Sequence, residues 1–176
     1  LGSELKKRYP NALTPTHKEL DIGNREQVLD YFKKHSDIDV IIHAGALTGI
    51  RPCEEDQPLA WNTNVEGTRN LVDAVLESKQ KIQFIYVSTA CVFDGHHEMY
   101  KESSIPYPEN YYALTKLVGE SEVRKLSEFL IARSFDINKP GTKIEDLHGG
   151  VLAGILKKGT IKVGDEIEIK PGITEK

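Results

Sequence analysis

Apolar positions follow different spacings in different parts of the chain. From Asn24, the segment NREQVLDYFKK carries Val28 and Phe32 on one helical face, with Asn24 as a candidate N-cap and Gln27 at the capping-box position. Over residues 39–46 the run DVIIHAGA is apolar at consecutive positions, which is typical of a strand buried on both faces of a parallel sheet. These spacings predict a helix followed by a buried strand.

The same two patterns repeat up to about residue 132. A second helix is predicted from about Asn64, and a third from near Tyr111 to about Glu128. Apolar runs at residues 82–87 and 129–132 predict two further strands. Because strands and helices alternate at the spacing of βαβ units, we expect an α/β fold with a Rossmann-like, doubly wound parallel sheet.

The pattern changes between residues 132 and 140. From Lys139 onward glycines become frequent, and apolar residues alternate with polar ones over residues 161–169. We therefore expect a short antiparallel β segment, with strands at 161–163 and 166–169 joined by a tight turn at residues 164 and 165. This divides the chain into a Rossmann-like domain at residues 1–132 and a β-barrel-like fragment at residues 133–176.

Composition narrows the range of functions. The chain has 176 residues, of which 28% are charged and 39% hydrophobic, so it can form a buried core. A net charge of -4 provides no basic surface for nucleic acid or an anionic membrane, and no stretch reaches the ~18 apolar residues of a membrane span. The two cysteines, Cys53 and Cys91, match no metal or redox spacing, which favours a reduced, cytoplasmic protein without a disulfide scaffold.

The residues suited to chemistry follow the predicted strands. Thr89 comes directly after the strand at 82–87, and Tyr112 and Lys116 are spaced i, i+4 on the third helix, so their polar tips can share a pocket. A lysine beside a phenol lowers the phenol pKa, as a tyrosine acting as a general acid or base requires. The alternative for the Tyr112–Lys116 pair alone is an ordinary pair on a helix surface.

Other polar residues favour structural interpretations. His43 lies inside an apolar strand run, which favours a core histidine over a ligand. His96 and His97 are adjacent and have no further ligand at metal spacing, so we predict no metal site. Cys91 has no histidine partner for nucleophilic chemistry and is expected to pack in the core.

Four ordered motifs place residues 1–132 near a known family. The motifs are IIHAGALT at 41–48, NTNVEGTRNLVDA at 62–74, VSTACVFDG at 87–95 and PYPENYYALTKLVGE at 106–120. Together they resemble the extended short-chain dehydrogenase/reductases, and within them the nucleotide-sugar reductases and epimerases of the dTDP-4-dehydrorhamnose reductase type. The resemblance implies an enzyme that uses NAD(P) to reduce a nucleotide-activated keto-sugar. A homo-oligomer is compatible with it.

The resemblance assigns roles to individual residues. Tyr112 would be the proton donor to a sugar ketone, Lys116 would lower its pKa and bind the nicotinamide ribose, and Thr89 would hold the reacting oxygen. The small segment after the first predicted strand and the pair expected at the adenine are further matches, so that the implied cofactor contacts are Gly2, Asp21, Ile22, Ala44, Gly45, Ala46, Asn64 and Lys116. From the residues alone, Asp21 is equally suited to forming a turn and Asn64 to capping a helix.

Two features bear on the cofactor. The segment LTPTHKE lacks the acidic residue expected to hold a free ribose 2′-hydroxyl, whereas Thr16, His17 and Lys18 could tolerate a 2′-phosphate, so NADP is favoured over NAD. The chain opens at LGSEL, which resembles the end of the family's glycine-rich turn with Gly2 as the last glycine. Since the preceding strand and glycines are not among these residues, we expect weak cofactor binding and loss of activity for these residues alone, and a working reductase where the molecule supplies that strand and turn.

Residues 133–172 resemble a different family. The segment GTIKVGDEIEI within them is similar to the start of the second, β-barrel domain of translational GTPases, especially the gamma subunit of archaeal and eukaryotic initiation factor 2. The chain is thus expected to be a chimera, with an engineered or composite chain favoured over a genuine fusion. Two alternatives to the reductase follow: a nucleotide-sugar epimerase or dehydratase, which shares every motif, and a non-enzymatic chain that carries a translation-factor fragment.

Overall fold

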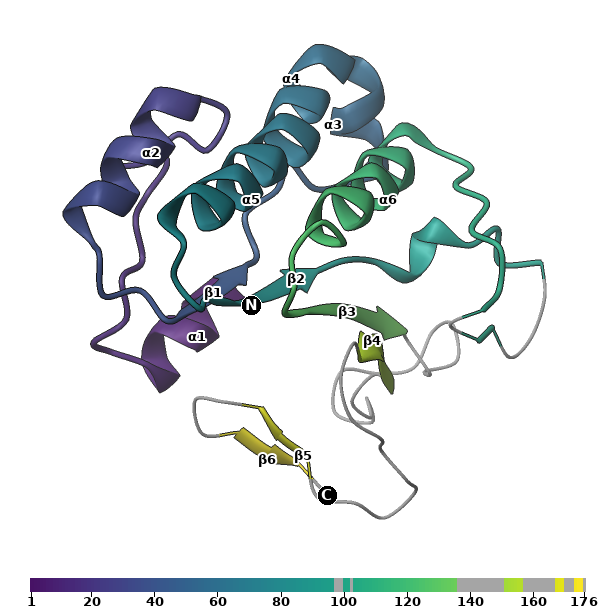
Figure 1. Ribbon diagram of the computed structural model, residues 1–176. Helices are drawn as coiled ribbons and strands as arrows, with labels where there is room; N and C mark the ends of the chain where they lie inside the picture. Colours follow the sequence, from purple (N-terminus) through teal and green to yellow (C-terminus); the bar gives the residue numbers. More distant parts are fainter. Residues whose placement is uncertain (97–99, 102, 136–150, 157–166, 170–172, 176) are drawn as a thin grey trace.

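A four-stranded sheet in the order β1-β2-β3-β4 organises the computed structural model (Figure 1). The structure describes residues 1–96, 100, 101, 103–135, 151–156, 167–169 and 173–175. The strands of the sheet are β1 (Val40–His43), β2 (Gln83–Val87), β3 (Phe129–Phe135) and β4 (Val151–Leu156). The first three are parallel and β4 is antiparallel to β3, which confirms the predicted α/β, Rossmann-like sheet.

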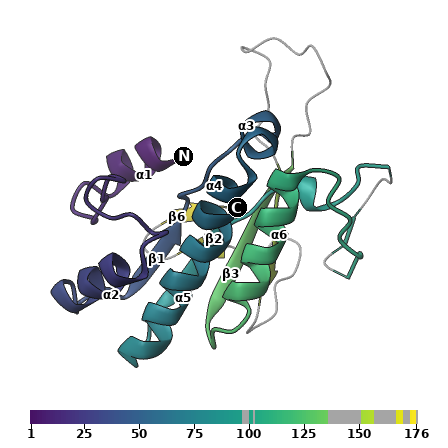
Figure 2. The ribbon, with the colours of Figure 1, turned by 90° about the horizontal axis from the view of Figure 1, so that it is seen from above.

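Three long helices cover one face of this sheet (Figure 1). They are α2 (Arg25–Lys34), α5 (Gly67–Ser78) and α6 (Tyr111–Val123), and they lie side by side, with α5 between the other two (Figure 2). Asn24 caps α2 as predicted, because its side chain accepts a hydrogen bond from the Gln27 amide at 3.2 Å. The Gln27 side chain does not complete a capping box and instead accepts a bond from the Asp21 amide.

The core lies between α5, α6 and the strands. It contains fully or almost fully buried side chains from each, including Val72, Val75, Phe84, Tyr86, Val123 and Ile131. Each such side chain contributes about 1.5–3 kcal/mol when it is removed from water. The apolar runs that predicted the strands are therefore the central layer of this core.

The second predicted helix corresponds to α5, which begins at Gly67 rather than near Asn64, and further helical segments precede it. Two short helices, α3 (Ile50–Glu55) and α4 (Gln57–Trp61), precede a π-helical turn, η1 (Asn62–Glu66), that leads into α5. Asp56 starts α4 by accepting a hydrogen bond from the Leu59 amide at 3.0 Å. Segments this short carry too few apolar positions for a helical period to be recognised.

The third predicted helix and the following strand differ from the prediction at their ends. Helix α6 ends at Val123 rather than near Glu128, because the chain turns at Arg124 and enters β3 at Phe129.

Two short helical elements remain among the described residues. A 3-10 turn, η2 (Ala90–Val92), follows β2, and α1 (Gly2–Arg8) lies at the N-terminus. In the described part of the chain, no helix is long and apolar enough to span a membrane.

The C-terminal part contains antiparallel β-structure, as predicted. Strand β4 pairs with β3, and β5 (Ile167–Ile169) pairs with β6 (Ile173–Glu175) in a second, two-stranded sheet. The predicted strand at 161–163 and the turn at 164 and 165 lie outside the described residues. Strand β3 continues past residue 132, and the domain boundary proposed there stays a prediction.

Candidate active site

Four of the ten predicted site residues follow the carboxyl ends of neighbouring parallel strands. His43, the last residue of β1, is paired with Tyr86 of β2, so the segments that leave these strands start side by side. The small residues Ala44 to Ala46 follow β1, and Thr89 follows β2. Such an edge of an open α/β sheet is where ligands bind.

Tyr112 lies beside Thr89. Helix α6 starts at Tyr111 because Asn110 accepts a hydrogen bond from the Ala113 amide at 2.8 Å, which places Tyr112 in the first turn. The phenol is half-buried, and the Thr89 side chain is its polar neighbour. Burial is the largest of the causes that raise the Tyr112 pKa above its ordinary value, and the neighbouring Thr89 side chain opposes this rise. The phenol is therefore protonated at neutral pH.

Lys116 lies one turn further along α6 and is buried, with 3% of its surface exposed. Its Nζ lies 4.1 Å from the centroid of the Tyr86 ring, which is a cation–π contact. Burial lowers the Lys116 pKa from 10.5 to about 8, while the nearby Glu120 carboxylate opposes this change. Lys116 was expected to lower the Tyr112 pKa, but that pKa is raised, because burial of the phenol is the dominant effect.

Asn64 connects the segment after β1 to α6. Its Oδ1 accepts from the Leu47 amide at 2.8 Å, and its Nδ2 donates to the Leu47 carbonyl at 3.0 Å and to Thr115 Oγ1 at 3.0 Å. With 1% of its surface exposed, Asn64 directs its amide to the protein rather than outward. The structure thus favours a positioning role for Asn64 over the cofactor contact and the helix cap considered from the sequence.

Ile22, one of the two residues expected at the adenine, lies next to the small segment after β1. A Cβ at Gly45 would lie 3.8 Å from Ile22 Cδ1 and 3.8 Å from His43 Cε1, so this chain's own packing leaves room for one. Gly45 is exposed, and Ala44 and Ala46 are partly exposed. The segment therefore offers open backbone to an incoming group, which fits the close approach of a dinucleotide.

Asp21 and Gly2 stand apart from this arrangement. The Asp21 carboxylate accepts a hydrogen bond from the Gly23 amide at 2.9 Å, so Asp21 forms the turn that was its alternative interpretation. Gly2 is the first residue of α1, and no heavy atom lies within 4 Å of the position that its Cβ would take. Its role in phosphate binding stays a prediction.

The histidine and cysteine expectations have different outcomes. His43 is a core histidine, as predicted, since its ring is buried and its Nε2 lies 3.0 Å from Thr68 Oγ1. Cys91 is exposed, so its expected core position is wrong. It lies in η2, where the Thr89 side chain holds its amide and the chain turns outward. Among the described residues, no group of three or more His, Cys, Asp or Glu side chains could hold a metal ion.

The sequence reasoning missed a buried charged cluster behind the site. Glu120 of α6 accepts hydrogen bonds from Ser88 Oγ at 2.6 Å, from Arg133 Nε at 2.8 Å and from Arg133 Nη2. The available signal was the spacing of Glu120, four residues after Lys116 and on the same helix face. Arg133 gave none, because it directly follows the strand predicted at 129–132, at the proposed boundary, whereas β3 continues to Phe135.

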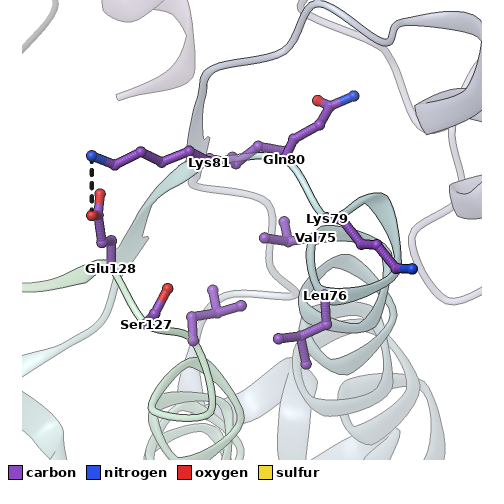
Figure 3. A pocket seen from close by; sticks show the side chains of 9 residues that line it. Val75, Leu76, Lys79, Gln80, Lys81, Ser127 and Glu128 are labelled. Carbon is purple, nitrogen blue, oxygen red and sulfur yellow. Dashed lines mark ion pairs between the residues drawn. The ribbon is translucent and has the colours of Figure 1, made fainter.

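A surface pocket lies at the opposite end of the sheet (Figure 3). It is lined by Leu76 and Ile82 and crossed at its rim by an ion pair between Lys81 and Glu128 at 3.4 Å. Since Ile82 precedes β2 and Glu128 precedes β3, the pocket is at the amino ends of the strands. It shares no residue with the Tyr112 site.

Comparison with known proteins connects the chain to two groups. Residues 1–136 match the family model described as RmlD substrate binding domain. The structure of dTDP-4-dehydrorhamnose reductase from Bacillus anthracis in complex with NADP is 31% identical, with a TM-score of 0.68 and coverage of 75% of this chain and 48% of that chain. The corresponding reductase structure from Clostridium acetobutylicum is 30% identical, with a TM-score of 0.69 and coverage of 81% of this chain and 52% of that chain.

The second group consists of translation factors. The translation initiation factor 2 subunit gamma of Methanocaldococcus jannaschii is 72% identical over 43 residues, which are 24% of this chain and 10% of that protein. This chain therefore spans about half of each reductase and a tenth of the initiation factor. Both resemblances expected from the sequence are confirmed, and the chain combines segments similar to two unrelated families.

Proposed function

The chain belongs to the family of the RmlD substrate binding domain, and from this premise we propose that it is an NADP-dependent reductase of a nucleotide-activated keto-sugar. The observation that carries the proposal is the placement of the half-buried Tyr112 phenol beside Thr89, one helical turn from the buried Lys116. A protonated phenol beside a second hydroxyl is suited to holding a carbonyl oxygen and giving it a proton.

In this proposal the ketone oxygen lies between Thr89 and Tyr112. When bound, the nicotinamide supplies a hydride to the carbonyl carbon. Tyr112 Oη gives its proton to the carbonyl oxygen, so the ketone becomes a secondary alcohol and Tyr112 is left as a phenolate. We assign to Lys116 the stabilisation of that phenolate and the contact with the nicotinamide ribose, as the resemblance implies.

The cofactor fits the segment after β1. The open backbone at Gly45, flanked by Ala44 and Ala46, would take the dinucleotide, and Ile22 would lie against the adenine. NADP is proposed over NAD because the Bacillus anthracis relative was solved with NADP. His17 and Lys18, which are both exposed, could pair with a 2′-phosphate.

The test uses the purified protein that carries this chain, with NADPH and dTDP-4-dehydrorhamnose. NADPH binding is followed by fluorescence and its oxidation by absorbance. We expect turnover to fall by about 10²–10⁴ in Tyr112→Phe, since the proton donor is lost. Tyr111→Phe is the matched control, one position away on the same helix, and should keep turnover. Equal turnover of Tyr112→Phe and wild type would overturn the mechanism.

The same assay separates the reductase from an epimerase or dehydratase. A reductase consumes one NADPH for each alcohol formed, whereas an epimerase regenerates its cofactor and consumes none. Stoichiometric NADPH loss with formation of the reduced sugar supports the proposal. Sugar conversion without net NADPH loss would assign the site to an epimerase.

The 72% identity to an initiation factor segment favours a second candidate, a non-enzymatic chain that carries part of a translation factor. If the chain is non-enzymatic, we expect no sugar turnover and no effect of Tyr112→Phe in any assay. Saturable NADPH binding together with turnover would reject it.

A further inference from the structure

Glu120 and Arg133 form a buried ion pair that the proposed reaction does not use. Only 1% of Glu120 and 5% of Arg133 is exposed. Arg133 contacts the carboxylate through both Nε and Nη2, which is a bidentate arrangement. Ser88 Oγ donates a third hydrogen bond to the same carboxylate.

Stability alone does not explain this pair. Removing two charges from water costs several kcal/mol for each ion, and replacing a buried pair by apolar side chains of similar size is often neutral or stabilising. A buried pair does, however, fix the geometry of the elements that it joins, since moving either element breaks charged hydrogen bonds. The relevant question is therefore which elements Glu120 holds in place.

Glu120 joins the catalytic face of α6 to two strand ends. On that face, Tyr112, Lys116 and Glu120 follow one another at intervals of four residues. Ser88 directly precedes Thr89 after β2, and Arg133 belongs to β3. Sliding α6 along the sheet would break all three hydrogen bonds of Glu120 and would also part the Tyr112 phenol from Thr89.

We propose that Glu120 is a positioning residue, which uses Ser88 and Arg133 to fix α6 on the sheet so that Lys116 and Tyr112 face Thr89. This rests on the proposed reductase function. Glu120 does not touch the reacting atoms and acts through the two residues that precede it on the helix face.

The charge of Glu120 has a second effect on the same site. Lys116 is a buried cation, Arg133 is another, and Glu120 is the carboxylate that opposes the fall in the Lys116 pKa. The titratable or charged groups around Lys116 come from all three parallel strands and from α6. They are His43, Tyr86, Glu120 and, through Glu120, Arg133, and Tyr112 lies one turn before Lys116 on α6. Removing the Glu120 charge leaves the two cations uncompensated, so Lys116 should lose its proton at lower pH.

The main test compares Glu120→Gln with Glu122→Gln. Glu122 is a matched control, because it is a buried carboxylate on α6 that pairs with Arg69 and Lys125 instead of the strands. Lysine labelled with ¹³C is followed by NMR against pH, without cofactor or substrate, and the Lys116 signal is assigned with Lys116→Met. We expect the Lys116 midpoint to fall by about one pH unit in Glu120→Gln and to stay in place in Glu122→Gln.

Turnover is the second measurement. We expect Glu120→Gln to lower kcat about tenfold with little change in KM, since misplacement of the proton donor affects the chemical step. The pH profile of kcat should move in the same direction as the Lys116 midpoint. Glu122→Gln should change neither quantity.

A milder variant covers the case in which Glu120→Gln does not fold. Ser88→Ala removes one hydrogen bond between α6 and the end of β2 and leaves the ion pair intact; we expect a few-fold loss of kcat with little change in KM, and no downward shift of the Lys116 midpoint, because Glu120 keeps its charge. The proposal is overturned if folded Glu120→Gln keeps the wild-type Lys116 midpoint or, where Glu120→Gln does not fold, if Ser88→Ala keeps the wild-type kcat in a protein whose kcat does fall in Tyr112→Phe. Loss of the proposed reductase function is recognised separately, because the NMR titration requires no activity.

Discussion

The ammonium nitrogen of Lys116 lies 4.1 Å from the centroid of the Tyr86 ring, inside the protein. Burial lowers the Lys116 pKa from 10.5 to about 8. Between these two values the unfolded chain binds more protons than the folded one, so the free energy of unfolding rises with pH over that interval. The positive charge of Lys116 thus costs stability at neutral pH, in exchange for a cation placed next to the site.

The pH dependence of stability should identify this cost. Urea unfolding of wild type and Lys116→Met is measured at several pH values from about 8 to 10, the interval bounded by the two Lys116 values. We expect wild type to gain stability relative to the variant as pH rises. The measurement stops at the upper end of this range, because tyrosines begin to ionise above it. Burial raises the Tyr86 pKa in the folded protein, so the unfolded chain loses this phenol proton first and the free energy of unfolding then falls with pH. Two parallel stability curves would contradict the prediction.

His43 should make the protein sensitive to acid. Burial, with a smaller effect of the Lys116 charge, lowers the His43 pKa from 6.5 to about 3. Between these two pH values the unfolded chain therefore binds a proton at His43 that the folded chain does not bind. As pH falls through this window, stability is lost, by about 1–2 kcal/mol between pH 6.5 and 5. His43→Gln keeps a donor for Thr68 and cannot titrate, so it should lose less stability over the same interval. Urea unfolding at the two pH values measures the difference, and an equal loss in both proteins would reject the assignment.

Gly119 should tolerate no side chain. A Cβ there would lie 2.2 Å from Tyr86 Oη, so Gly119→Ala must displace the tyrosine ring over which Lys116 lies. We expect a loss of about 1–3 kcal/mol in the free energy of unfolding. Gly45→Ala is the control, because its Cβ would meet nothing closer than 3.8 Å. A Gly119→Ala protein as stable as Gly45→Ala in urea would show that the ring can move freely.

Asn64 should contribute more to stability than another buried asparagine of the same helical segment. Its amide makes three hydrogen bonds, to both backbone groups of Leu47 and to Thr115, whereas Asn70 donates one to the Ile22 carbonyl. We expect Asn64→Ala to lose about 2–4 kcal/mol and Asn70→Ala about 1 kcal/mol. Urea midpoints with unchanged slopes measure both. Similar losses would indicate that the Leu47 segment relaxes without Asn64.

The long elements could be predicted from the sequence because each carries its own signal. Helix α2 has a cap at Asn24 and an apolar stripe, and β1 and β2 are short apolar runs between polar segments. Thr89, Tyr112 and Lys116 could be proposed as a site from the sequence because strand ends and helix spacing indicate which side chains lie on one side of a sheet. The structure places Tyr112 beside Thr89 and Lys116 one turn further along α6, and their catalytic roles stay a prediction.

What the sequence did not predict depends on contacts between distant segments. The Tyr112 pKa is set by how deeply the phenol is buried, and burial is a property of the packed structure. Glu120 and Arg133 are 13 positions apart and become partners only when α6 lies against β3. Short helices such as α3 have no stripe of their own, and their ends are set by neighbours rather than by their composition.

The π-helical turn at Asn62–Glu66 determines how the start of α5 is oriented toward β1 and α6. Within this turn Asn64 reaches Leu47 and Thr115, and four residues later Thr68 reaches His43 and returns a bond to the Asn64 carbonyl. An α-helix advances about 100° per residue, so a chain shorter by one residue here would keep a continuous helix and rotate one of these two side chains away from its partner. The extra residue of the π turn therefore sets the rotation of α5 about its axis relative to Asn64. A change in the length of this segment should cost more stability than a change in its exposed side chains.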